Sequence, residues 1–213
     1  MTKKGAMQLI GMLDSPYVRR VAVAMLTAGV AFEHKPISLF RHIDAFSALS
    51  PLLKAPTLIA EDGGAVVESS VILEYLTWRR PALTALRPES LPAFRALGAA
   101  LTVMEMAVHL HYERALRGPG ERSESWRERV TGQLAVGLSG LEAGAPEGWL
   151  DDALGHADIA VACAFGFAQG TIGDIVATDS YPRLAAFAAR AEALPAFRAA
   201  PAQDGVAVRT EAL

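Results

Sequence analysis

Two short stretches of this 213-residue chain place polar side chains where a helix is expected to begin. Ser15 and Pro16 follow a short apolar run, and a serine before a proline is typical of a helix N-terminus. Glu68 and Ser69 follow another apolar run and precede a helical pattern. Because the first N–H groups of a helix lack partners within it and lie at its positive end, such places can bind an anion. Each serine can also be an N-cap with no other role.

The elements that must position these residues form an α/β pattern over residues 7–79. Predicted strands cover residues 7–13, 31–37, 57–60 and 65–67, and predicted helices cover 16–28, 41–48 and 69–79. A Gly-rich turn at residues 61–64 predicts a hairpin between the last two strands. The first strand–helix–strand unit is expected to give parallel strands. We therefore predict a mixed four-stranded sheet with the order βαβ, a helix, then ββα.

The second half of the chain is predicted to be entirely helical. Pro81, Pro88 and Pro92 mark residues 81–90 as a linker between a domain over 1–80 and a helical domain over 91–213. Helical patterns cover about 91–116, 123–143 and 155–171, and two shorter ones begin near residues 181 and 195. The apolar run at 159–168 is expected to be a buried helix, with Gly155 and Asp158 at its start.

Composition limits the class of protein. Hydrophobic residues make up 52% of the chain, which allows a sizeable core, and a net charge of -3 does not favour a nucleic-acid partner. The single cysteine, Cys163, cannot form an internal disulfide, which fits a reducing compartment. We see no signal peptide and no apolar run near the ~18 residues of a membrane helix, so a soluble cytoplasmic protein is expected. His109 and His111 project about 200° apart around a helix, so we expect no metal site there.

The α/β half, the linker and the helical half together resemble the cytosolic glutathione S-transferases, in the bacterial type with serine at the catalytic position. Three motifs carry the resemblance: residues 15–17 (SPY), 54–58 (KAPTL) and 68–76 (ESSVILEYL). It implies an α/β thioredoxin-like glutathione-binding domain followed by an all-α domain, and a homodimer. Glutathione would be a co-substrate, with no metal.

The resemblance also implies how glutathione is held. Ser69 would bind the γ-glutamyl carboxylate, and Glu68 would accept from the ammonium group. Ala55, before a cis Pro56, would pair its backbone with the cysteinyl part. Lys54 and His42 are candidates for the glycyl carboxylate, although both can equally be solvated surface residues.

Ser15 is the residue expected to carry the chemistry. A free thiol has a pKa of about 8.5, so little of it is thiolate at neutral pH. A hydroxyl that donates to the sulfur stabilises the thiolate, and the N-terminus of a helix acts in the same direction. The glutathione thiolate is then the nucleophile. A serine cannot form a mixed disulfide, which argues against an oxidoreductase that uses a protein cysteine.

The electrophile is expected to lie between the domains, against Pro16, Tyr17, Met104 and His111. The leading prediction is conjugation of glutathione to small hydrophobic electrophiles, a detoxification reaction. Glutathione-dependent isomerisation of a maleyl-type substrate and dehalogenation use the same site and remain open. So does a non-catalytic interaction protein with this fold.

Overall fold

The computed structural model describes residues 5–203, 205 and 207. The described chain divides into two compact units. One contains the residues up to 87 and those from 193 onward, and the other contains residues 88–192.

The first unit is built on a mixed four-stranded sheet. Its strands are β1 (Gln8–Ile10), β2 (Glu33–Lys35), β3 (Thr57–Ile59) and β4 (Ala65–Val67), in the spatial order β2-β1-β3-β4. β1 pairs with β2 in parallel, whereas β1–β3 and β3–β4 are antiparallel. The predicted mixed sheet and its hairpin are confirmed, and each strand pairs over three residues.

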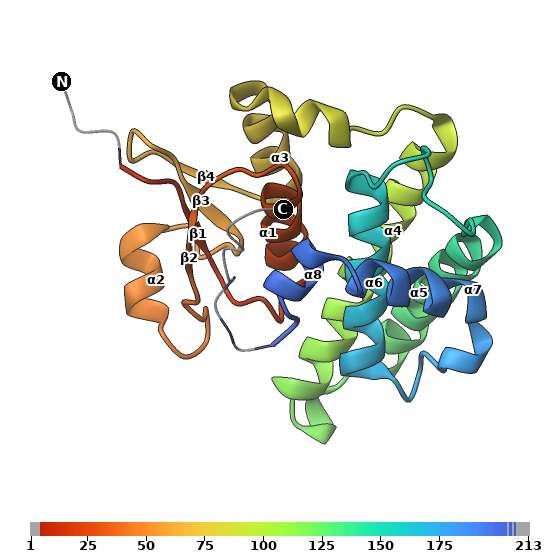
Figure 1. Ribbon diagram of the computed structural model, residues 1–213. Helices are drawn as coiled ribbons and strands as arrows, with labels where there is room; N and C mark the ends of the chain where they lie inside the picture. Colours follow the sequence, from red (N-terminus) through yellow and green to blue (C-terminus); the bar gives the residue numbers. More distant parts are fainter. Residues whose placement is uncertain (1–4, 204, 206, 208–213) are drawn as a thin grey trace. The chain divides into compact units, whose positions relative to one another are not determined.

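Three helices cover this sheet. α1 (Pro16–Thr27) and α3 (Ser69–Arg79) lie on one face, and α2 (Ile43–Leu49) lies on the other (Figure 1). Nearly all of α1 is buried, because it contacts β1, α3 and two further segments of the same unit. The central strands contribute Leu9, Ile10 and Leu58 to the core, all without exposed surface.

The end of the chain returns to this unit. α8 (Pro195–Ala199) packs against α1, and the Arg19 Nε–H donates to the Ala200 carbonyl oxygen at 2.8 Å. The Arg19 guanidinium also lies 5.3 Å from the ring centroid of the buried Phe197. The structure thus differs from the predicted boundaries, which gave all of 91–213 to the helical domain. Within the predicted linker 81–90, residues Pro81–Leu86 form a 3₁₀ helix, η1, that packs on α3.

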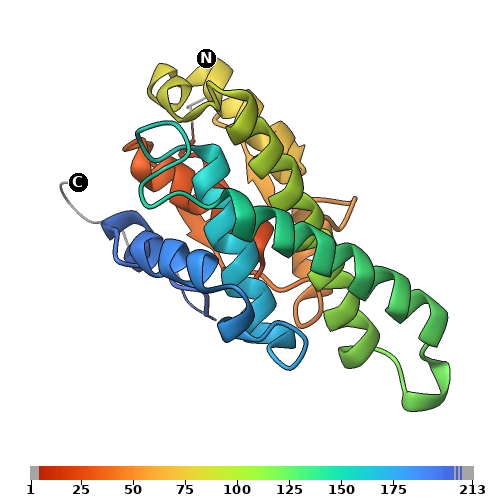
Figure 2. The same cartoon turned by 90° about the vertical axis from the view of Figure 1, so that its right-hand side faces the viewer.

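The second unit is entirely helical except for its loops. Its helices are α4 (Leu91–Ala115), α5 (Glu124–Gly144), α6 (His156–Ile172) and α7 (Pro182–Glu192), with short 3₁₀ turns η2 (Pro119–Glu121) and η3 (Thr178–Ser180). Figure 2 shows α4 and α5 packed against each other. The expected buried helix is confirmed by α6, where the Asp158 carboxylate accepts from the Gly155 and Leu150 N–H groups at 2.8 and 3.0 Å.

In the described part of the chain, α4 is the one helix long and apolar enough, by length and composition, to cross a membrane. Arg95, Glu105 and Glu113 interrupt its apolar residues, so it contains no run of about 18 consecutive apolar residues. α4 packs extensively against α5 and α6 in its own unit. A core helix of a helical bundle meets the same criteria, because its apolar residues face its neighbours.

Candidate functional site

Ser15 begins α1 and caps it. Its Oγ accepts a hydrogen bond from the Val18 N–H at 3.4 Å, and its backbone is extended, with φ −72° and ψ 123°. A hydroxyl that accepts a bond still has its own proton to donate. Ser15 is half-buried, so a ligand sulfur at the N-terminus of α1 could receive that proton.

The loop before α1 lies close to the Ala55–Pro56 turn. A Cβ added at Gly11, whose φ is +134°, would lie 2.6 Å from Val18 and 3.3 Å from the Ala55 side chain. Only glycine therefore allows this approach. The Ala55–Pro56 peptide bond is cis, as the resemblance implies. The segments that carry Ser15 and Ala55 are thus brought together.

Glu68 and Ser69 form the second part of the site, at the start of α3. Glu68 is the N-cap, and its carboxylate accepts from the Ser70 and Val71 N–H groups at 3.0 and 3.2 Å. The Ser69 hydroxyl donates to the Glu68 carboxylate at 3.3 Å. The backbone of Glu68 has φ 73°, a left-handed conformation that costs a non-glycine residue about 1–2 kcal/mol.

The buried guanidinium of Arg20 contacts the start of α3. Arg20 is on α1, and its Nη1 donates to the Ser69 and Ser70 hydroxyls at 3.1 and 3.2 Å. Arg20 and Ser69 are both almost fully buried. The start of α3 therefore combines a carboxylate, hydroxyls, a guanidinium and the N–H groups of a helix N-terminus. Such a set can bind an anion and a cation side by side, as an amino-acid zwitterion requires.

Sequence reasoning gave Arg20 no role. The available signal was a pair of arginines, Arg19 and Arg20, within the otherwise apolar stretch of the first helix. His34 was also missed, although it lies in β2 beside β1. Its Nε2–H donates to the Gly11 carbonyl oxygen at 2.8 Å, and its Nδ1 accepts from the Ala207 N–H at 3.0 Å. Burial lowers the pKa of His34, so the ring holds the loop before α1 in its neutral form.

His42 and Lys54 are not joined to these groups by a contact in the described part of the chain. His42 is exposed at the start of α2, and its Nδ1 accepts from the Ser38 N–H at 3.2 Å. The other ring nitrogen then carries the proton and can donate to a carboxylate. Lys54 is exposed, and its carbonyl oxygen accepts from the Thr57 hydroxyl at 2.7 Å.

The four residues predicted to line an electrophile pocket belong to different units. Pro16 is buried and Tyr17 is half-buried at the start of α1. Met104 and His111 lie seven residues apart on α4 and therefore share a helix face. Met104 is 0% exposed and belongs to the core of the helical unit, and its place beside an electrophile stays a prediction. His111 is half-buried, with its ring 6.0 Å from that of Phe167.

Among the described residues, no group of three or more His, Cys, Asp or Glu side chains is arranged to hold a metal ion. Cys163 is buried in α6, inside the helical unit. The chemistry of the site rests on hydroxyl, carboxylate, guanidinium and backbone groups at the starts of α1 and α3.

Comparison with known proteins agrees with this arrangement. Residues 9–85 match the family described as the N-terminal domain of glutathione S-transferase. The GST-like protein YibF of Escherichia coli is 30% identical over 165 residues, which cover 76% of this chain and 81% of that protein. The chain belongs to the glutathione S-transferase family. The thioredoxin-like first domain and the helical second domain are those of this family.

Two further similar proteins give information on the ligand and the reaction found in this family. The maleylacetoacetate isomerase of Pseudomonas aeruginosa is 30% identical over 191 residues, covering 85% of this chain and 89% of that enzyme. A glutathione S-transferase from Methylobacillus flagellatus, solved with glutathione bound, is 25% identical with a TM-score of 0.82. The match covers 92% of this chain and 98% of that one. Members of the family similar to this chain therefore bind glutathione.

Proposed function

We propose that this protein binds glutathione at the starts of α1 and α3 and joins the glutathione sulfur to a small hydrophobic electrophile. The observation that carries the proposal is the cluster of Glu68, Ser69 and Arg20 at the N-terminus of α3. It supplies groups of both charges for the γ-glutamyl end, which carries one carboxylate and one ammonium.

Each part of glutathione is bound by a different group of residues in this proposal. The Ser69 N–H begins α3 and has no carbonyl acceptor within the helix, so it donates to the γ-glutamyl carboxylate. The charge of Arg20 acts on the same carboxylate through the Ser69 hydroxyl. Glu68 keeps lone pairs for the ammonium group. The Ala55 backbone pairs with the cysteinyl part, and Lys54 and His42 attract the glycyl carboxylate.

Ser15 then acts on the sulfur. Its hydroxyl donates to the thiolate and lowers the thiol pKa, together with the positive end of α1. The thiolate attacks an electrophilic carbon, and a new C–S bond forms. In a displacement the leaving group departs with its bonding electrons. In an addition to a double bond, the carbon next to the new bond takes up a proton. We place the electrophile beside Pro16 and Tyr17.

Isomerisation is the second candidate reaction, because maleylacetoacetate isomerase is similar to this chain over most of its length. The thiolate would add to a cis double bond, the resulting single bond would rotate, and the thiolate would leave again. Glutathione is regenerated in this reaction, whereas conjugation consumes it. Measuring free thiol during turnover of a maleyl substrate and of an aryl halide distinguishes the two.

We also propose that the protein is a cytoplasmic homodimer. α3 and α4 carry large exposed apolar side chains, among them Trp78 (74% exposed) and Phe94 (57% exposed). Exposed apolar patches of this kind are typical of protein interfaces. Sedimentation velocity on the full chain is expected to give twice the mass of one chain, and a monomer at all concentrations would exclude this proposal.

The decisive experiment is calorimetric titration of glutathione into the wild type, Glu68→Ala and the control Glu74→Ala. Glu74 is an exposed carboxylate on the same helix, outside the site. We expect Glu68→Ala to bind about 10- to 100-fold more weakly, because a charge-assisted bond to the ammonium is lost. Glu74→Ala should bind like the wild type. If the wild type fails to bind at millimolar glutathione, the proposed function is wrong.

A further inference from the structure

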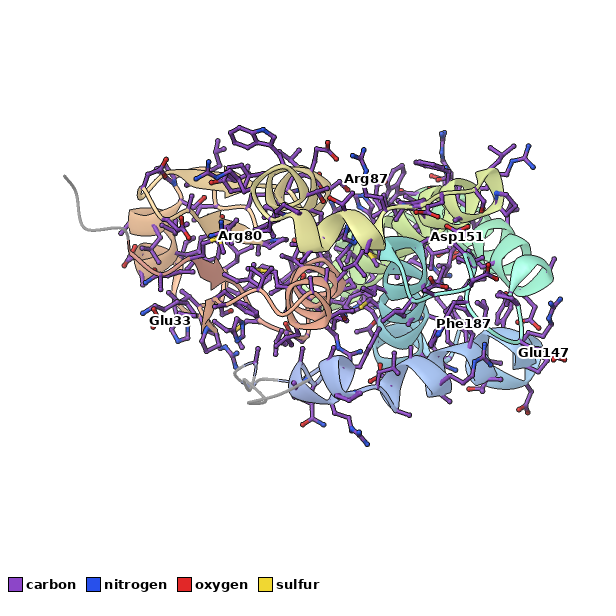
Figure 3. The ribbon with its side chains drawn as sticks, turned by 45° about the horizontal axis from the view of Figure 1, so that its top comes forward. Glu33, Arg80, Arg87, Glu147, Asp151 and Phe187 are labelled. Carbon is purple, nitrogen blue, oxygen red and sulfur yellow. The ribbon has the colours of Figure 1, made fainter. Side chains whose placement is uncertain are left out.

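His34 has no direct part in the proposed binding of glutathione, yet it is buried in the unit that carries the site. It lies in β2, an edge strand of the sheet, opposite Leu9 of β1. Its neighbours in β2, Glu33 and Lys35, pair with each other at 2.7 Å, and Figure 3 shows Glu33 at the outer edge of this unit. Because side chains alternate along a strand, neither neighbour shares the face of His34. The buried ring instead has a backbone partner at each of its two nitrogens.

These two partners fix the tautomer of the ring. The Ala207 N–H donates to Nδ1 of His34 at 3.0 Å, so Nδ1 carries no proton. In the neutral ring the proton is then on Nε2, which lies 2.8 Å from the Gly11 carbonyl oxygen. Burial lowers the pKa of His34, which favours this neutral form. The Ala207 amide thus directs a hydrogen-bond donor of the ring toward Gly11.

Gly11 is bonded to β2 on both sides. Its N–H donates to the Lys35 carbonyl oxygen at 3.0 Å, and its carbonyl oxygen accepts from His34. The next carbonyl oxygen, that of Met12, accepts from the Ser15 N–H at 3.2 Å. Since the Gly11 carbonyl and the Met12 N–H belong to one planar peptide group, a shift of this carbonyl turns the segment that leads to Ser15. One continuous series of bonds therefore runs from His34 to the backbone of Ser15.

The position of Gly11 also relates two parts of the proposed site. Gly11 approaches Ala55 so closely that an added Cβ would lie 3.3 Å from the Ala55 side chain. Ala55 is proposed to pair with the cysteinyl part of glutathione, and Ser15 is proposed to act on its sulfur. A shift at Gly11 would therefore move the Ser15 hydroxyl relative to the sulfur. The groups at the start of α3, which are proposed to bind the γ-glutamyl end, would stay in place.

We propose that His34 is a positioning residue of the transferase reaction, which fixes the Ser15 hydroxyl at the glutathione sulfur by holding the Gly11 carbonyl. The Ala207 amide supports it by selecting the tautomer that donates to Gly11. This role rests on the proposed function and adds to it a contribution from the end of the chain. It acts on the thiol pKa and the rate, and little on the affinity for glutathione.

The first test compares the full-length wild type with His34→Leu and His34→Gln, and with His109→Leu as the control for an exposed histidine. We measure the Kd for glutathione by calorimetry, the thiol pKa of bound glutathione from the ultraviolet absorbance of the thiolate, and kcat with an aryl halide. In His34→Leu the thiol pKa should rise toward about 8.5, and kcat at neutral pH should fall about three- to tenfold, with little change in Kd. The amide of His34→Gln can donate to the same carbonyl oxygen and should restore most of kcat.

The second test concerns the end of the chain. Ala207→Pro removes the N–H that bonds the ring, whereas Ala207→Ser keeps it. We expect Ala207→Pro to raise the thiol pKa and to lower kcat about two- to threefold, and Ala207→Ser to behave like the wild type. In the His34→Leu background Ala207→Pro should cause no further loss, because the amide acts through the ring.

The possible failures are distinguishable. A wild type that does not bind glutathione, or that leaves its thiol pKa unchanged, overturns the proposed function and the role of His34 with it. If the wild type binds glutathione and lowers the thiol pKa, three results overturn the role of His34 alone. These are a wild-type thiol pKa in His34→Leu, a His34→Gln variant as slow as His34→Leu, and a loss of affinity in His34→Leu as large as the loss of kcat.

The variants at Ala207 provide an independent decision. Equal effects of Ala207→Pro in the wild-type and His34→Leu backgrounds would show that the end of the chain does not act through the ring. Thermal melts check that each variant folds. If His34→Leu does not fold, Ala207→Pro and Ala207→Ser still decide, because an equal thiol pKa in these two variants overturns the proposal.

Discussion

The starts of α1 and α3 are both capped by a polar side chain, yet the two ends are built differently. Glu68 caps α3 with two hydrogen bonds, and the charge of Arg20 lies behind it. Ser15 caps α1 with one long bond of 3.4 Å, and the first turn of α1 contains no acidic residue. The start of α3 is a rigid, charged end suited to holding a zwitterion. The start of α1 is a neutral end whose hydroxyl can turn toward a sulfur.

The largest effect is expected at the start of α1. In Ser15→Ala, kcat for conjugation of an aryl halide should fall about 100-fold, as for loss of one donor to a developing anion. The Kd for glutathione should change little. The pH profile of kcat should also move upward, toward the thiol pKa of about 8.5. The control Ser47→Ala removes a hydroxyl on α2 that donates to the Asp44 carbonyl oxygen, away from both helix starts. If Ser15→Ala instead weakens binding at unchanged kcat, the two helix starts do not divide their roles in this way.

Substitution of Arg20 tests the role proposed for the start of α3, which is to bind glutathione. Arg20→Met removes the donor to the Ser69 and Ser70 hydroxyls, and the Kd for glutathione should rise about tenfold. Saturating glutathione should restore most of kcat, because the sulfur is not involved. Arg20→Lys keeps the charge and should bind more tightly than Arg20→Met. Thermal melts of both variants check that the buried position is tolerated.

A smaller effect is expected on the free energy of unfolding when the residue at position 68 is changed. Glycine adopts φ 73° without steric cost, so Glu68→Gly should be about 1 kcal/mol more stable than Glu68→Ala. Urea unfolding of the two variants measures the difference. Both lose the carboxylate and should bind glutathione equally poorly. An equal stability of the two variants would contradict the strain inferred at this cap.

The smallest effect concerns His34, which supports the loop before α1. Burial lowers its pKa in the folded protein, so the unfolded chain takes up the proton first as the pH falls. Stability should therefore be full above about pH 6.5 and decrease below it, by at most about 1.4 kcal/mol per pH unit. Urea unfolding from pH 7.5 to 5 measures the slope. His34→Gln should flatten it, whereas His109→Gln, an exposed histidine, should not.

Local sequence signals were sufficient for much of this fold. The helix predicted over 69–79 is observed as Ser69–Arg79, and that predicted over 16–28 as Pro16–Thr27, because caps and prolines mark these ends in the sequence itself. The first strand was predicted over 7–13 but pairs only over Gln8–Ile10, since pairing depends on a distant partner. The role of Arg20 depends on packing between α1 and α3. The burial of Met104 depends on which apolar residues of α4 face the core, which periodicity does not tell.

The docking of the last helix on α1 has a consequence for how the molecule can be made. The Arg19–Ala200 hydrogen bond joins residues 181 positions apart, so the first helix meets this partner only after all the residues between them have been synthesised. Until then, a surface of α1 that carries Arg19 lacks the cover of Phe197. The segment with Ser15 and Arg20 leaves the ribosome early, yet its packing is completed late. A fragment ending at residue 87 would keep that helix surface open to solvent and to other chains.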